Sequence, residues 1–151
     1  MTPASEPELS FLDPGDGRRI AIRLREAADP KLPSVLFLPG YASDMEGQKA
    51  VAIDQFCASR GLGCLRMDYS GTGSSAGDFA SGTLARWLDE VLAAIDLGIP
   101  DGALILAGSS MGGWLALHAA LRRKDRIVGL LGSPPRPTSP TGAILRKTAP
   151  C

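Results

Sequence analysis

The sequence predicts an α/β fold, in which helices cover both faces of a mostly parallel sheet. Two observations carry this prediction. Short apolar segments typical of buried strands alternate with longer segments of helical apolar spacing. In addition, 44% of the 151 residues are hydrophobic and 21% are charged, which is a globular composition. A chain of this length is expected to form one domain with its own core, without disulfides or a metal.

Five segments carry strand signals. Residues 19–25 alternate apolar with polar or small side chains, which is typical of a half-buried strand. The other four are short apolar runs, as expected for parallel strands buried on both faces. These runs are residues 35–38, 63–67, 103–107 and 127–131.

Three segments between these strands have helical spacing. Residues 47–60 place Ala50, Ile53, Phe56 and Cys57 on one face, so that Cys57 is expected in the core. Residues 84–95 carry a continuous apolar stripe, with Thr83 as the expected N-cap. Residues 111–121 are apolar on nearly every side.

Charge divides the chain near residue 132. Residues 1–132 hold all 16 acidic residues and a net charge of −3, whereas residues 133–151 hold +3 and five of the twelve prolines. A segment so poor in apolar groups cannot offset its ordering entropy by burial. We therefore expect a domain over residues 1–132 and a disordered Pro/Ser/Thr-rich tail over residues 133–151.

Several classes of protein are excluded on composition. The pI of 6.6 and the lack of a basic cluster argue against a nucleic-acid partner. No apolar stretch is long enough for a membrane span, and the polar, acidic residues 1–16 resemble neither a signal nor a transit peptide. The cysteines Cys57, Cys64 and Cys151 fit neither a disulfide framework nor a zinc site. We therefore expect a cytoplasmic protein without cofactor or metal.

A catalytic motif lies between the strand expected at residues 103–107 and the helix that follows. Residues 108–112 read Gly-Ser-Ser-Met-Gly and match G-x-S-x-G, in which a sharp turn from strand to helix exposes the central serine. This makes Ser110 the expected nucleophile. The alternative is a tight turn that only requires small residues.

A serine nucleophile requires donors for the oxyanion. The N–H of Met111, which follows the serine, is one expected donor. The second should lie in the loop after an earlier strand, where Leu38-Pro39-Gly40-Tyr41 makes Tyr41 the expected donor. A simple strand-ending turn is the alternative for this loop.

Together these blocks resemble the α/β-hydrolase group of mitochondrial palmitoyl-protein thioesterases and their bacterial relatives. The resemblance covers about residues 9–132. It implies a serine esterase or thioesterase with an acyl-enzyme intermediate, acting on a small-molecule or acyl-protein ester or thioester. It also implies a sheet that continues after residue 131, so that the C-terminal strands of the fold are missing. The blocks that carry it are residues 37–41, 47–50, 68–75, 108–114 and 117–120.

The chain departs from this group in its catalytic triad. The group carries the acid and the histidine on loops after later strands. The single histidine here, His118, lies eight residues after Ser110 on the same expected helix, about 12 Å along its axis. A general base must lie within about 3 Å, so His118 is expected to pack rather than to catalyse. The hydrolase is therefore expected to be impaired, and a non-catalytic truncated fragment is the alternative.

A second alternative is nucleotide binding at residues 71–75. Residues 71–76 resemble the G-x-G-x-x-A fingerprint, but the fingerprint should open a helix directly, and residues 77–82 have loop composition. Asp68 before this loop is expected to bind loop amides, with a minor catalytic role as its alternative.

The strand expected at residues 127–131 has no later strand in this chain to pair with. An exposed apolar strand edge is a template for association with another chain. We therefore expect self-association through this strand.

Overall fold

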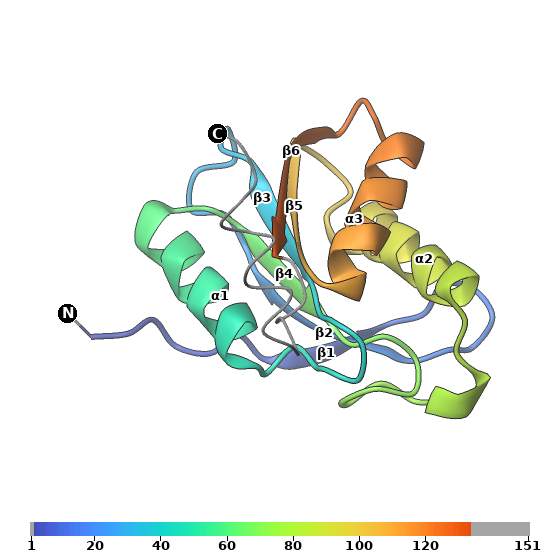
Figure 1. Cartoon of the computed structure of the whole chain (residues 1–151). Coiled ribbons are helices and arrows are strands. Elements are labelled where there is room, and N and C mark those ends of the chain that lie inside the picture. Colours follow the sequence, from blue (N-terminus) through green and yellow to red (C-terminus); the bar gives the residue numbers. More distant parts are fainter. Residues whose placement is uncertain (1, 134–151) are drawn as a thin grey trace, which may run out of the picture.

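The computed structural model describes residues 2–133, which form one six-stranded sheet in the order β1-β2-β4-β3-β5-β6 (Figure 1). Three of the five strand pairings are parallel, namely β3 with β4, β3 with β5, and β5 with β6. The strands are β1 (Leu9–Leu12), β2 (Ile20–Arg25), β3 (Ser34–Leu38), β4 (Cys64–Met67), β5 (Leu104–Ser109) and β6 (Ile127–Ser133). The predicted mostly parallel sheet is confirmed.

Helices cover both faces of the sheet (Figure 1). One face carries α1 (Gln48–Arg60), and the other carries α2 (Leu84–Ala93) and α3 (Met111–Arg122). A π-helical turn at Ala94–Gly98 extends α2, and a short 3-10 turn, η1 (Phe79–Ser81), precedes it. The three predicted helices are confirmed, and the Thr83 hydroxyl accepts the Arg86 N–H as the N-cap of α2.

The sheet separates two apolar clusters. The larger lies under α2 and α3, where the buried α2 residues Trp87, Leu88 and Val91 are part of the predicted apolar stripe. The smaller lies under α1 and includes Cys57 and Cys64, so the predicted burial of Cys57 is confirmed. Because the strands between the two clusters are covered on both sides, they need continuous apolar runs rather than alternation.

Three details differ from the sequence-based expectations. Strand β1 was not predicted, because its residues are mostly exposed at the sheet edge and show little apolar alternation. Phe56 is 54% exposed, while Asp54 on α1 is buried and accepts two hydrogen bonds from Arg25, at 3.0 and 2.7 Å. Ser133, assigned to the tail, is the last residue of β6. Residues 134–151, the rest of the expected tail, lie outside the described residues.

Two further properties concern the described residues only. None of the helices within residues 2–133 is long and apolar enough to cross a membrane. The same residues contain no cluster of three or more His, Cys, Asp or Glu side chains that could hold a metal ion.

Candidate functional site

Ser110 occupies a strained turn between β5 and α3. Its φ of 54° and ψ of −113° lie outside the regions that L-residues favour, and Ala42 is the other non-glycine residue with positive φ among residues 2–133. Such a conformation costs on the order of 1–3 kcal/mol and persists only where the surrounding structure imposes it. Ser110 is exposed at this turn.

The surrounding glycines explain how the turn is imposed. A Cβ on Gly112 would lie 2.0 Å from the carbonyl oxygen of Leu38, and one on Gly108 would lie 2.3 Å from the carbonyl carbon of Gly112. Residues 108 and 112 must therefore be glycine for α3 to approach both β5 and the end of β3. The spacing of the motif thus follows from backbone packing.

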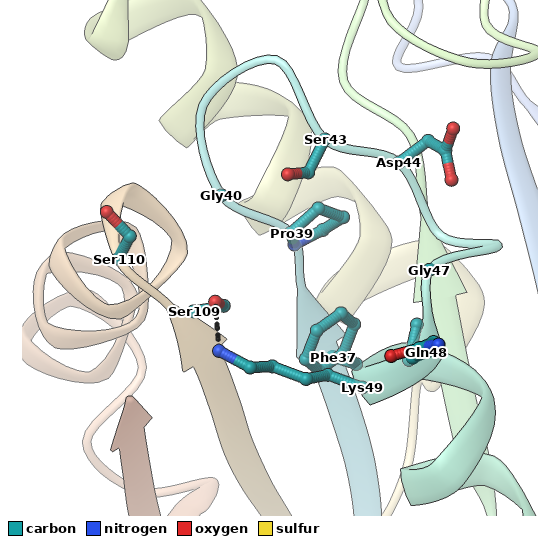
Figure 2. Close-up of a pocket in the computed structure, with 11 residues that line it drawn as sticks. Phe37, Pro39, Gly40, Ser43, Asp44, Gly47, Gln48, Lys49, Ser109 and Ser110 are labelled. Atoms are coloured by element: carbon teal, nitrogen blue, oxygen red, sulfur yellow. Dashed lines mark hydrogen bonds between the residues drawn. The ribbon is translucent and has the colours of Figure 1, made fainter. Parts of the chain in front are cut away.

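The loop after β3 lies directly beside this turn (Figure 2). A Cβ built on Gly40 would lie 3.6 Å from the Cβ of Ser110. The N–H groups of Tyr41 and Met111 donate no hydrogen bond to any part of the chain that the structure describes. Met111 opens α3, where the first N–H groups of a helix have no partner within the helix. The structure therefore brings Ser110, Met111 and the Tyr41 loop together.

Tyr69 holds the loop after β3 in place through a hydrogen bond to Pro39. This role was not predicted from the sequence. Its side chain is fully buried, and its hydroxyl donates a 2.8 Å hydrogen bond to the carbonyl oxygen of Pro39. Burial, the largest cause, raises the pKa of Tyr69 well above its ordinary value, so that the hydroxyl stays a donor. Because Tyr69 and Pro39 are 30 residues apart in the chain, no local sequence pattern indicates that they form a hydrogen bond.

Lys49 reaches the site from α1 (Figure 2). Its Nζ donates to Ser109 Oγ at 3.2 Å and to Ser133 Oγ at 2.7 Å. The Ser133 carbonyl oxygen in turn accepts the N–H of Ser110 at 2.8 Å. Lys49 and Asp44 lie on the wall of a cavity of about 410 Å³ that reaches Ser110, which we call the Lys49 cavity.

His118 does not take part in this arrangement. Its ring lies 3.9 Å from that of Trp114, one turn earlier on α3. This agrees with the packing role expected for it. The sequence contains no other histidine.

Asp68 holds the loop of residues 71–75, as expected. The buried carboxylate accepts the N–H of Met45 at 2.8 Å and that of Ser74 at 2.9 Å. Burial raises the pKa of Asp68, while these two N–H groups oppose the shift. A Cβ on Gly73 would lie 2.1 Å from the carboxylate, and the loop leads to the three-residue η1 rather than to a helix. Because only the three-residue η1 follows it, the loop lacks the helix N-terminus that the dinucleotide fingerprint requires.

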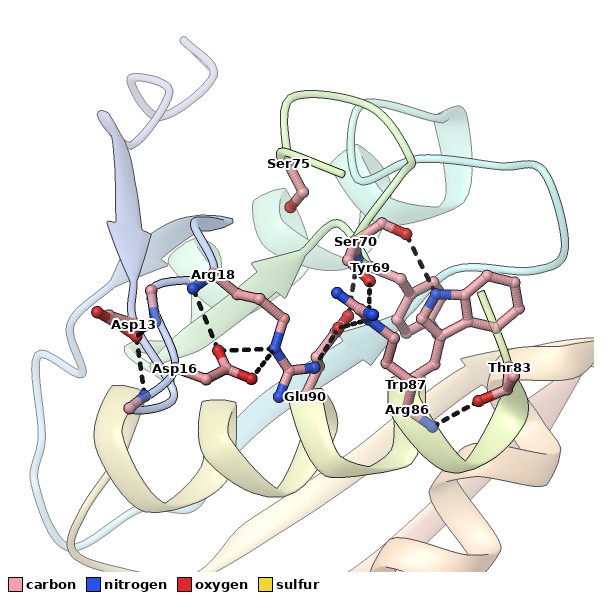
Figure 3. A network of polar contacts seen from close by, with 12 residues as sticks. Asp13, Asp16, Arg18, Tyr69, Ser70, Ser75, Thr83, Arg86, Trp87 and Glu90 are labelled. Carbon is pink, nitrogen blue, oxygen red and sulfur yellow. Dashed lines mark hydrogen bonds and ion pairs between the residues drawn. The ribbon is translucent and has the colours of Figure 1, made fainter. Parts of the chain in front are cut away.

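A buried carboxylate attaches the start of this loop to α2 (Figure 3). Glu90, which is fully buried, accepts the N–H of Ser70 at 2.7 Å and Arg18 Nη1 at 2.8 Å. The indole N–H of Trp87 donates to the Ser70 carbonyl at 3.2 Å. Pairing of this kind is what allows a charge to remain in the interior.

The mostly parallel sheet, covered on both faces and carrying a strained serine turn between β5 and α3, defines the α/β-hydrolase class of folds. The chain belongs to the alpha/beta hydrolase family, whose model matches residues 35–150. That match includes most of the segment expected as a tail.

Individual relatives agree with this assignment. The chain is 48% identical over 124 residues to the human mitochondrial palmitoyl-protein thioesterase ABHD10. The aligned region covers 82% of this chain and 39% of the relative. The structure matches mouse alpha/beta hydrolase domain-containing protein 10 with a TM-score of 0.75 and 43% identity, covering 83% of this chain and 48% of that one. A putative hydrolase from Agrobacterium vitis S4 matches with a TM-score of 0.75 and 39% identity, over 87% and 52% of the two chains. The chain thus spans about two fifths of its curated relatives and half of these structures.

Proposed function

We propose that this chain carries the nucleophile and oxyanion half of a serine hydrolase that acts on acyl esters or thioesters. The observation that carries the proposal is the strained Ser110 turn, flanked by the N–H groups of Tyr41 and Met111, which have no partner within residues 2–133. The similarity to proteins named palmitoyl-protein thioesterases favours an acyl thioester as substrate.

The proposed reaction forms a bond between Ser110 Oγ and the acyl carbonyl carbon. The carbonyl oxygen becomes an oxyanion that accepts the N–H groups of Tyr41 and Met111. Collapse breaks the bond to the thiol or alcohol, which leaves with the proton that the serine loses. Water then releases the acid in a second attack of the same kind. Both attacks need a general base, and His118 lies too far along α3 to serve as one.

We therefore propose that Ser110 of the 151-residue chain reacts only slowly. In a serine protease, loss of triad members leaves about 10³–10⁴-fold acceleration over water from the oxyanion hole and binding. A fluorophosphonate probe should label the purified chain slowly, with mass spectrometry placing the adduct on Ser110. The matched control is Ser109→Ala, which should label like the parent, whereas Ser110→Ala should not label.

Two results would contradict these proposals. Rapid, stoichiometric labelling of Ser110 would show that the chain is not impaired. Labelling that persists in Ser110→Ala would show that Ser110 is not the nucleophile. A chain that takes up no probe at any concentration favours the other reading of the sequence, a non-catalytic truncated fragment.

The cellular location of the protein is a separate proposal. We propose a cytoplasmic location, because both described cysteines, Cys57 and Cys64, are free thiols as in a reducing compartment, although the curated relatives are named as mitochondrial. Cell fractionation tests this directly. Recovery of the protein in purified mitochondria, protected from added protease, would contradict it.

A further inference from the structure

A second hollow adjoins the site and shares no lining residue with the Lys49 cavity. Its volume is about 460 Å³, within the range of small-molecule pockets. The two linings include consecutive residues of the chain, since Gly40 and Ser110 line the Lys49 cavity and Tyr41 and Met111 line the second one. We call the second one the aromatic hollow. Its lining residues are Tyr41, Phe79, Ala80, Gly82, Thr83, Leu84, Trp87 and Met111.

Three neighbouring aromatic rings form part of its wall. The rings of Tyr41 and Phe79 lie 5.2 Å apart in an edge-on arrangement, and those of Phe79 and Trp87 lie 5.8 Å apart. The indole N–H of Trp87 is already paired with the Ser70 carbonyl, so the ring offers only apolar surface to the hollow. A Cβ on Gly82 would lie 2.2 Å from the Trp87 ring, which shows how closely the wall is packed there.

The two hollows differ in chemistry. Within residues 2–133, the lining of the aromatic hollow contains no Asp, Glu, Lys, Arg or His, whereas the Lys49 cavity contains Asp44 and Lys49. Apolar groups gain from leaving water, while polar groups lose unless they find partners. An apolar chain is therefore favoured in the aromatic hollow, and a polar group is favoured in the Lys49 cavity.

The expected oxyanion donors, Tyr41 and Met111, line the aromatic hollow, and each directly follows a residue that lines the Lys49 cavity. In the proposed complex, the N–H groups of Tyr41 and Met111 bind the carbonyl oxygen of the substrate. The carbonyl carbon also carries the acyl chain and the leaving group, and both then lie close to Tyr41, Met111 and Ser110. We propose that the aromatic hollow receives the apolar acyl chain and the Lys49 cavity receives the thiol or alcohol leaving group. This inference rests on the proposed serine hydrolase function and adds the part of the substrate that each hollow selects.

Binding of saturated carboxylates from butanoate to decanoate tests the inference without requiring turnover. Trp87 lines the hollow, so its fluorescence should report binding in a Trp114→Phe background, in which Trp87 is the sole tryptophan. Each methylene that enters the hollow should tighten binding about fourfold, the factor expected for burial of one CH₂ group. Affinity independent of chain length would overturn the inference.

Two variants locate the binding. Leu84→Asp places a charge in the lining of the hollow, at the first residue of α2, where an acidic side chain interacts favourably with the helix dipole. It should weaken decanoate binding at least tenfold. Leu97→Asp, at a similarly exposed leucine outside the hollow, is the matched control and should leave binding unchanged.

A third variant tests whether decanoate binds instead to the exposed apolar side chains of β6. Leu131→Lys alters β6, and the inference is overturned if it, rather than Leu84→Asp, removes decanoate binding. Failure of the inference and of the proposed function are separable. If carboxylate affinity rises with chain length but the fluorophosphonate probe does not label Ser110, only the proposed function is contradicted. If the probe labels Ser110 but Leu84→Asp leaves decanoate affinity unchanged, only the role of the aromatic hollow is contradicted.

Discussion

Strand β5 carries the serine turn at its end, and its two flanks differ sharply. On the β3 side, Gly112 packs against the Leu38 carbonyl oxygen so closely that no Cβ fits. On the β6 side, a Cβ built on Gly132 meets no atom of the described residues within 4 Å, and Val128 and Leu131 are 63% and 62% exposed. Ser133 of β6 accepts the N–H of Ser110 with its carbonyl oxygen. The comparison indicates that the β3 flank imposes the turn, while the β6 flank packs loosely among the residues that the structure describes.

The largest effect is expected at Gly112. Gly112→Ala places a Cβ 2.0 Å from the Leu38 oxygen, and since that oxygen is backbone, relief requires movement of α3 or β3. We expect a loss of about 3 kcal/mol or more in the free energy of unfolding, measured by urea denaturation. Gly113→Ala is the matched control, because its Cβ meets nothing closer than 3.7 Å and alanine favours a helix by up to about 1 kcal/mol. Equal stability of the two variants would show that the β3 flank does not impose the turn.

The next effect is expected at Tyr69. Tyr69→Phe removes the donor to Pro39 and leaves a buried carbonyl oxygen without its partner. We expect a loss of about 1–3 kcal/mol in the free energy of unfolding, together with slower probe labelling of Ser110, because the loop that carries the Tyr41 N–H loosens. The matched control is Tyr41→Phe, which alters an exposed hydroxyl and should leave stability unchanged. Unchanged labelling of Tyr69→Phe would contradict a role for Tyr69 in positioning the loop.

On the β6 flank, we propose self-association through the exposed strand edge. Leu131→Lys should weaken it at least tenfold, as measured by size-exclusion chromatography with light scattering over a range of concentrations, because charges on an edge strand oppose pairing. Leu9→Lys is the matched control, on the opposite edge strand β1, and should not change association. A parent chain that stays monomeric at all concentrations would contradict the proposal.

The smallest effect is expected at the ion pair between Asp96 and Arg123, which joins the π-helical turn after α2 to the C-cap of α3 at 2.7 Å. The hydrogen bond from Arg123, the largest cause, lowers the pKa of Asp96. A lowered pKa contributes stability above the unfolded value of about 3.9, and this contribution is lost as the pH falls through the folded value. Because both side chains are partly exposed, Asp96→Asn should lose less than about 1 kcal/mol at pH 7.

The pH dependence checks the sign of this effect. The difference in unfolding free energy between the parent and Asp96→Asn should shrink toward zero as the pH falls below the unfolded value. Asp89→Asn, at an exposed acid on α2 without an ion pair among the described residues, should show no such pH dependence. A difference for Asp96→Asn that grows at acid pH would contradict the pairing.

Much of the fold could be predicted because the signals are local. The apolar runs of β3, β4 and β5 and the stripe of α2 are legible in the sequence, since strands buried on both faces and helices buried on one face require those patterns. Strand β1 was missed because an exposed edge strand needs no such pattern. Asp54 was missed because its partner, Arg25, lies on another element.

The same division holds at the site. The sequence determined where a serine turn could form, because Gly108 and Gly112 at that spacing are residues that permit the close approach of strand and helix. The tertiary structure alone decided that the Tyr41 loop lies beside Ser110, that Tyr69 holds it, and that Lys49 reaches Ser109 and Ser133. The close approach of Gly108 to Gly112 joins near neighbours in the chain and so appears in the order of residues, whereas the approach of Gly112 to Leu38 does not. Hydrogen bonds and hollows join residues from different strands and helices, and these arise only when the sheet brings its strand ends together.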